Sequence, residues 1–189
     1  MSSNTISIER LRHDPLRRKF ALLNVIGGVL VLATYGWGVV AADAMMTSLW
    51  GGVPEAIRPL YTVNMFLSAA GYFFFAPYIL LRVDSGRQDI LGGFGYSLFS
   101  KFMMLVLLPS ALWLPLTSIM LSQPSPGLWV AIRVVLALVA VGSLGLLLSL
   151  WTLRPPRGPG HVAALVGLVP FCLQTVVLDA LVWPAYFTY

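Results

Sequence analysis

The chain has 189 residues, of which 58% are hydrophobic and 10% are charged, and its mean hydropathy is +0.85. About a quarter of the residues of a typical soluble domain are charged, so these values exclude a soluble globular protein and indicate a chain that lies in a membrane. The net charge of +5 comes from basic residues at the ends of apolar runs, which is typical of contacts with lipid headgroups and not of nucleic-acid binding.

The chain begins with a basic segment, residues 1–19, that we expect in the cytoplasm. Within this segment, Ile6–Arg18 mixes apolar and charged residues, a pattern that can lie along the membrane interface as a short helix. Pro15 is expected to end or kink that helix. The apolar run that follows is too long for the core of a signal peptide and lacks a small-residue cleavage site, so it is predicted to be a retained first span.

Five apolar runs are long enough to cross ~30 Å of hydrocarbon, which takes roughly 20 helical residues. They are Phe20–Ala42, Tyr61–Leu81, Leu98–Leu121, Leu128–Trp151 and Val162–Pro184. We therefore predict an all-α polytopic membrane protein in which residues 20–189 form one compact bundle of five transmembrane helices.

The basic residues predict the orientation of this bundle. Of the 12 lysines and arginines, all but two precede the first span or lie in the second–third or fourth–fifth connections; they are Arg10, Arg12, Arg17, Arg18, Lys19, Arg82, Arg87, Lys101, Arg154 and Arg157. Because positive charge accumulates on the cytoplasmic side, the N-terminus is predicted to be cytoplasmic and the C-terminus outside. Trp37, Trp50, Trp129 and Trp183 then fall near the outer ends of the spans, where indole rings anchor at headgroup level.

The connections differ in length. Asp43–Leu60 is the longest outer loop, and its Met45, Met46, Leu49 and Trp50 predict a stretch that dips into the interface. Ser122–Gly127 and Arg154–Gly160 are short, so the third, fourth and fifth spans are predicted to be antiparallel neighbours.

Two charged residues lie inside predicted spans. Arg133 and Asp179 are each five residues inside the outer ends of the fourth and fifth spans, about 7–8 Å below the interface at 1.5 Å per residue. Either charge alone would cost roughly 2.5–3.5 kcal/mol there, so we expect the two to face each other. The pair can be a purely structural clamp or part of a binding site, and Arg133 can instead extend to the headgroups.

Polar residues recur on one face of two spans. Tyr61, Asn64, Ser68 and Tyr72 share a face of the second span, and Thr175 and Asp179 share one of the fifth, with Gln174 close by. Because lipid would penalise these faces, we expect them to point into the bundle and line a polar cavity that opens to the outside. Simple interhelical hydrogen bonding would explain the same pattern without a ligand.

Small residues and prolines also recur within the spans. Glycines such as Gly27, Gly71 and Gly142 predict close helix packing. Pro170 in the fifth span frees a backbone carbonyl at membrane depth, which is typical of a kink.

Several kinds of site chemistry have too few residues to support them. One cysteine, Cys172, excludes a disulfide within the chain, and with only His13 and His161 no metal or cofactor site is expected. Both histidines lie on the predicted cytoplasmic side, whereas Asp179 is near the outer face, so a Ser–His–Asp site is not expected and neither is an enzyme.

The sequence therefore favours a non-enzymatic integral membrane protein, by default of a bacterial cytoplasmic membrane. We expect it to bind or transport a small amphipathic or anionic molecule in an outer-facing cavity. The expected ligand-binding residues are Arg133, Asp179, Asn64, Tyr61, Ser68, Tyr72, Thr175 and Gln174. The alternative is an accessory or assembly subunit of a larger membrane complex. Membrane lipids, other membrane subunits or a second copy of the chain are the expected partners, and nucleic acid is not.

Overall fold

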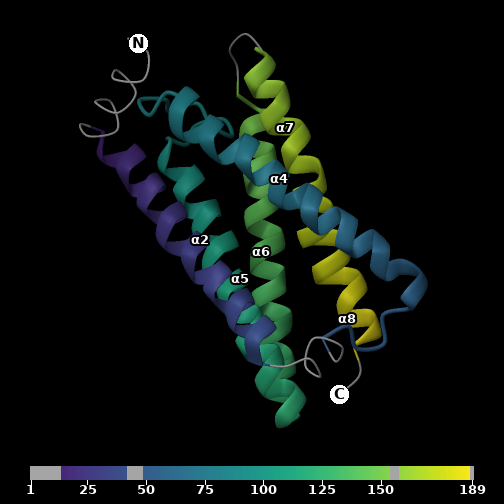
Figure 1. The fold of residues 1–189 in the computed structure, drawn as a ribbon. Coiled ribbons are helices and arrows are strands. Elements are labelled where there is room, and N and C mark those ends of the chain that lie inside the picture. The colour runs from purple at the N-terminus through teal and green to yellow at the C-terminus, as the bar shows by residue number, and fades with distance from the viewer. Residues whose placement is uncertain (1–13, 42–48, 154–157, 188–189) are drawn as a thin grey trace.

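The computed structural model describes residues 14–41, 49–153 and 158–187, and every regular element in these ranges is helical (Figure 1). The elements are α2 (Pro15–Ala41), the short 3₁₀ helix η1 (Glu55–Ile57), α4 (Arg58–Arg82), α5 (Ser97–Ser122), α6 (Pro126–Trp151), α7 (Pro159–Cys172), the π-helix η2 (Leu173–Val182) and α8 (Trp183–Tyr186). Five helical segments of the described chain are long and apolar enough to cross a membrane, and α7, η2 and α8 together form the fifth. The all-α, five-span prediction is confirmed to this extent.

The start of α2 differs from the sequence prediction. Pro15, which was expected to end or kink the interfacial helix, is the first residue of α2, where its missing N–H costs nothing because the first amides of a helix have no intrahelical partner. Asp14 accepts hydrogen bonds at Oδ1 from the backbone amides of Leu16 and Arg17, at 3.0 and 3.2 Å. The first span therefore begins five residues earlier than expected. The rest of the expected interfacial segment, residues 1–13, lies outside the described residues.

Two pairs of helices form the bundle, with α2 packed against one of them. α5 and α6 make an antiparallel hairpin, α4 packs along α7, and α2 lies on α5 (Figure 1). The third, fourth and fifth segments are antiparallel neighbours, as their short connections predicted.

The two ends of the bundle differ in chemistry. One end, here called the basic end, carries Arg17, Arg18, Lys19, Arg82, Arg87 and Lys101. The opposite end, here called the aromatic end, carries Trp50, Trp113, Trp129, Trp183 and Phe187, which pack into the second of two apolar cores. The larger core fills the half of the bundle nearer the basic end, around Phe75, Tyr96 and Phe99.

At the crossing of α4 and α7, two glycines bring the backbones of the helices together. A Cβ on Gly71 would lie 2.2 Å from the carbonyl oxygen of Gly167, and a Cβ on Gly167 would lie 2.7 Å from the carbonyl oxygen of Gly71. Only glycine permits this backbone-to-backbone approach. Gly27 and Gly142 also meet neighbouring atoms at close range, whereas Gly28 has open space beside it.

At the basic end, α2 and α4 are tied together. The buried guanidinium of Arg17 donates to the carbonyl oxygens of Leu80 and Val83, at 2.5 and 2.8 Å, and Arg17 Nε donates to Asp14 Oδ2 at 3.1 Å. Burial opposes ionisation of Asp14. The pKa of Asp14 nevertheless lies below 3.8, because its carboxylate is stabilised by hydrogen bonds from Ser85 and from the backbone amides of Arg17 and Leu16, and by the charge of Arg17. Together these outweigh burial.

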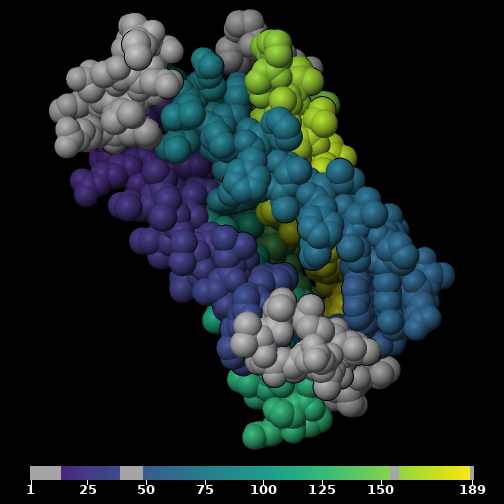
Figure 2. Space-filling model, viewed as in Figure 1, coloured from purple at the N-terminus to yellow at the C-terminus, as the bar shows by residue number. Residues whose placement is uncertain are grey.

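Toward the aromatic end, α2 and α4 separate. Halfway along, Tyr72 of α4 still donates a hydrogen bond to Asn24 Oδ1 of α2, at 2.6 Å. Beyond this contact α2 follows α5 while α4 follows α7, and Figure 2 shows a cleft between the two helices with η2 visible at its floor.

Candidate functional site

A chain of hydrogen bonds crosses from α4 to η2 beside this cleft. Asn64 Nδ2 donates to Gln174 Oε1 at 3.0 Å, and Gln174 Nε2 donates to Asp179 Oδ1 at 2.8 Å. Asn64 Nδ2 and Ser68 Oγ also donate to the carbonyl oxygen of Pro170, at 3.1 and 2.8 Å. Asn64 and Ser68 are both buried, so the polar face predicted for the second span does point into the bundle. Two of these hydrogen bonds, from Asn64 to Gln174 and from Gln174 to Asp179, lead to the Asp179 carboxylate.

The π-helix η2 makes this chain possible. Gln174 and Asp179 are five residues apart, so in an α-helix their side chains would lie about 140° apart around the axis. In a π-helix the repeat is i to i+5, and both side chains fall on one face. The widened turn begins three residues after Pro170, which lacks the N–H that a regular helix would use. Single π-turns within α-helices are frequent at functional sites. The π-helical stretch of this protein is longer and covers 10 residues.

Asp179 of η2 is near one tyrosine of α2 and one tyrosine of α4. It is close enough to the phenols of Tyr35 on α2 and Tyr61 on α4 to act on both electrostatically. Tyr61 is buried and donates to the carbonyl oxygen of Leu178 at 2.9 Å, which fixes α4 against the residue next to Asp179. The Asp179 side chain is partly accessible, and within the described chain its Oδ2 receives no hydrogen bond. One carboxylate oxygen is therefore held by Gln174, and the other is available.

Aromatic rings surround this region. The rings of Tyr35 and Trp113 have centroids 6.4 Å apart, and Trp113 is 5.8 Å from Trp183 in an edge-to-face contact. Trp183 Nε1 donates to the carbonyl oxygen of Leu49 at 2.8 Å, whereas the buried Trp113 Nε1 has no hydrogen-bond partner among the described residues. The sequence analysis missed Tyr35 and Trp113. Tyr35 is a hydroxyl-bearing ring inside an apolar run, which was the available signal.

Three expected ligand-binding residues lie elsewhere: Tyr72, Thr175 and Arg133. Tyr72 bonds to Asn24, nearer the basic end, and its ring packs against Phe75. Thr175 faces α6 and donates to Ser143 Oγ at 2.8 Å. The structure therefore brings Asn64, Ser68, Gln174, Asp179 and Tyr61 together and gives Tyr72 and Thr175 separate interhelical bonds.

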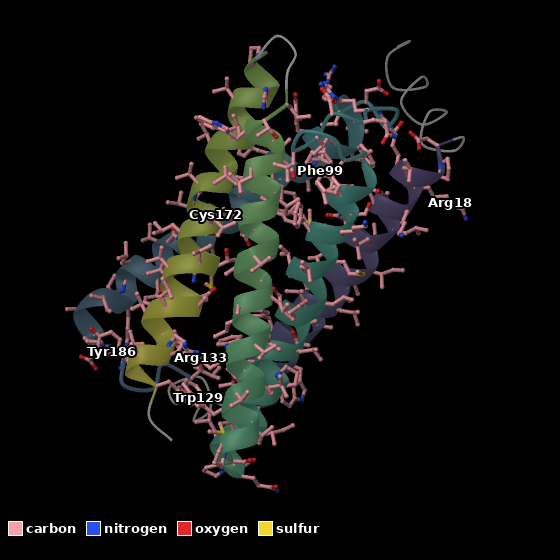
Figure 3. All side chains as sticks on the ribbon, turned by 180° about the vertical axis from the view of Figure 1, so that it is seen from behind. Arg18, Phe99, Trp129, Arg133, Cys172 and Tyr186 are labelled. Carbon is pink, nitrogen blue, oxygen red and sulfur yellow. The ribbon has the colours of Figure 1, made fainter. Side chains whose placement is uncertain are left out.

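The expected ion pair between Arg133 and Asp179 is wrong. No ion pair joins them: the described bonding of Asp179 is to Gln174, and the exposed Arg133 places its guanidinium carbon 5.9 Å from the centre of the Trp129 ring. Figure 3 shows Arg133 and Trp129 close together at the aromatic end of α6.

Equal depth in the membrane was insufficient to predict a contact. The face of α6 that packs inward contains Ile132, Val135 and Leu136, and Arg133 lies just off it, between the exposed Val130 and Val134. α6 is apolar on all sides, so its sequence gives no indication of which face is buried. The direction of Asp179 also depends on the π-helix.

Other features of the described chain are weaker candidates for a functional site. An apolar groove of about 230 Å³ lies over the α4–α7 crossing, lined by residues such as Leu67, Phe74, Val166 and Pro170. His161 is buried and stacked on Tyr78, with its Nε2 2.9 Å from the Leu150 carbonyl oxygen. Within the described ranges, no three histidine, cysteine or acidic side chains come together in a group that could hold a metal ion.

Comparisons with protein-family models, with curated proteins and with solved structures found no match for this chain. The function must therefore be argued from the site itself.

Proposed function

We propose that this protein is a non-enzymatic integral membrane protein that binds or transports a small amphipathic molecule in the cleft between α2 and α4. In this proposal the molecule presents a cationic or hydrogen-bond-donating head group to Asp179, and its apolar body lies against the aromatic rings and the lipid. The observation that carries the proposal is the Asp179 carboxylate, held through one oxygen by Gln174 and available at the other.

The preference for a ligand with a cationic or hydrogen-bond-donating head group follows from the negative charge of Asp179. A carboxylate inside the membrane costs roughly 2.5–3.5 kcal/mol when nothing compensates it. A single amide hydrogen bond from Gln174 compensates only part of this cost, and the described chain forms no ion pair with Asp179. A ligand with an ammonium or hydroxyl group would supply the missing partner. An anionic ligand, which the sequence analysis also considered, would need Arg133 at this site.

The aromatic residues favour the same class of ligand. Tyr35, Tyr61 and Trp113 are close to the carboxylate or to one another, and aromatic faces attract organic cations. An amphipathic amine or alcohol combines the required head with a body that suits an apolar cleft.

We further propose that the basic end lies in the cytoplasm, so that the cleft opens toward the outer leaflet. The clustering of Arg17, Arg18, Lys19, Arg82 and Lys101 at one end supports this orientation. A bacterial cytoplasmic membrane remains the proposed location.

Thermal unfolding in lipid nanodiscs with matched ten-carbon amphiphiles tests the proposal. Decylamine is expected to raise the unfolding midpoint of the wild-type protein more than decanoate does, because a ligand that binds only the folded state stabilises it by ~2.7 kcal/mol at a hundred times its dissociation constant. Asp179→Asn keeps an acceptor for Gln174 and should remove the preference for the amine. Glu55→Gln, an acid-to-amide change at a side chain that is 90% exposed, should keep it.

The same preference in Asp179→Asn as in the wild type would refute the proposal. An accessory subunit, the second candidate, would show no stabilisation by any of these amphiphiles and would be extracted together with other membrane proteins.

A further inference from the structure

Arg133 is an exposed cation on α6 whose guanidinium has no acceptor among the described residues. It lies between Val130 and Val134, which are 60% and 52% exposed. Within the described residues it forms no ion pair and no hydrogen bond. Five N–H donors of a permanently charged group therefore face the surroundings of the bundle.

The direction of the side chain brings this charge to the membrane surface. Arg133 is seven residues from the start of α6 at Pro126, a rise of about 10 Å. Its guanidinium lies beside Trp129, one helical turn closer to that start, so the long side chain extends toward the aromatic end. The first backbone amides of α6 lie on the same side and have no side-chain cap, so the helix dipole adds positive character there.

Trp129 is held in place as a support for the guanidinium. Its ring is stacked on Phe187 at 5.5 Å with an interplanar angle of 12°, and it also contacts Trp183 at 6.1 Å. Figure 3 shows Trp129 and Arg133 on the same part of α6. A rigid ring restricts where the guanidinium can lie, which favours a ligand that uses two parallel hydrogen bonds.

We propose that Arg133, supported by Trp129, binds the phosphodiester of a membrane lipid at the aromatic end of the bundle. A phosphodiester offers two acceptor oxygens that match the guanidinium fork, and lipid headgroups are the phosphates found at this depth. An anionic lipid such as phosphatidylglycerol suits the site best, because its head group adds no competing cation. This site is distinct from the Asp179 site and takes the opposite charge.

The test is native mass spectrometry of delipidated protein titrated with phosphatidylglycerol, with diacylglycerol as a lipid that lacks phosphate. Arg133→Gln is expected to weaken phosphatidylglycerol binding about tenfold or more, the usual effect of losing a charge-assisted pair of hydrogen bonds. Arg133→Lys should weaken it less, since the charge remains but the fork is lost. Arg82→Gln, which removes an exposed arginine at the basic end, should leave this binding unchanged, and diacylglycerol binding should be the same in all variants.

Three results would overturn the proposal. Unchanged phosphatidylglycerol binding in Arg133→Gln would show that the guanidinium is not the ligand. An equal loss in Arg82→Gln would show that the number of positive charges, rather than this position, sets lipid binding. Displacement of phosphatidylglycerol by millimolar inorganic phosphate would assign the site to free phosphate instead of a lipid. Arg133 makes no hydrogen bond within the described part of the chain, so its substitution removes none there. Far-UV circular dichroism of each variant checks that the helices are intact.

Discussion

The α4–α7 crossing allows a stability prediction to be worked out from distances. In Gly71→Ala, the new methyl carbon would lie 2.2 Å from the Gly167 carbonyl oxygen and 2.9 Å from its carbonyl carbon. An ordinary carbon–oxygen contact is about 3.3 Å, so the two helices must move apart by roughly 1 Å. Both sides of the contact are backbone, so no side-chain rotation can relieve it.

The separation has two costs. Overpacking of this kind destabilises by about 1–3 kcal/mol. Ser68 and Asn64, one and two turns from Gly71 along α4, bond to the Pro170 carbonyl oxygen at 2.8 and 3.1 Å. A movement of this size would break both bonds. At about 0.6 kcal/mol each, their loss adds about 1.2 kcal/mol. The total destabilisation is therefore about 2–4 kcal/mol before any gain in helix propensity.

Gly28→Ala is the matched control. No atom of the described residues lies within 4 Å of a Cβ at Gly28, so this variant has the same gain in helix propensity without the clash. The assay is unfolding by sodium dodecyl sulfate in mixed micelles, followed by circular dichroism. Gly71→Ala should unfold with a free energy about 2–4 kcal/mol lower than Gly28→Ala. A difference below about 0.5 kcal/mol, the range of changes that touch nothing, would refute the described crossing.

Three further predictions concern the contacts between α2 and α4. Arg17→Gln should destabilise the protein by about 2–4 kcal/mol, because it leaves the Leu80 and Val83 carbonyl oxygens without their charged donor. Hydrogen exchange of the backbone amides at the end of α4 should then become faster. Arg18→Gln, a change at an exposed residue, is the control and should have no effect. The Asp14 pKa is lowered on folding, so Asp14 contributes stability above its ordinary value of 3.8 that is lost as the pH falls through the folded value. Urea or detergent unfolding of the wild type should therefore weaken with acidification below 3.8 more than that of Asp14→Asn, and parallel curves would contradict this. Tyr72→Phe should cost about 0.6 kcal/mol through the lost bond to Asn24 and leave amphiphile binding intact; a loss of binding would mean that the ligand site extends to Tyr72.

The five spans could be predicted from local apolarity, and the adjacency of the third, fourth and fifth from their short connections. The contacts of α4 with α7 and of α2 with α5 join segments that are distant in sequence, and they were not predicted. The inward direction of Asn64 and Ser68 could also be predicted, because two polar residues at helical spacing must avoid lipid. The first span was predicted to begin five residues too far along the sequence, because the charged residues Arg17, Arg18 and Lys19 were interpreted as part of an interfacial segment. In the structure Arg17 is buried under the end of α4, where two carbonyl oxygens accept its hydrogen bonds.

The part of the site that could not be predicted depends on tertiary geometry. Gln174 and Asp179 share a face only because η2 is a π-helix, and no composition rule predicts 10 residues of π-helix after Pro170. The Arg133–Asp179 pair was expected from equal depth alone. Because α6 is apolar on all sides, the rotation of that helix about its axis is set by packing against α5 and η2 and has no sequence signal.

The measurement that tests the central proposal most directly is mass spectrometry of the small molecules that remain with the protein after gentle extraction from its own membrane. Wild type, Asp179→Asn and Arg133→Gln would be compared. The proposal predicts an amphipathic molecule with an amine or hydroxyl head that is bound at fixed stoichiometry, retained in Arg133→Gln and lost in Asp179→Asn. The same molecule retained in Asp179→Asn would contradict the assignment of the cleft carboxylate as the ligand-binding group.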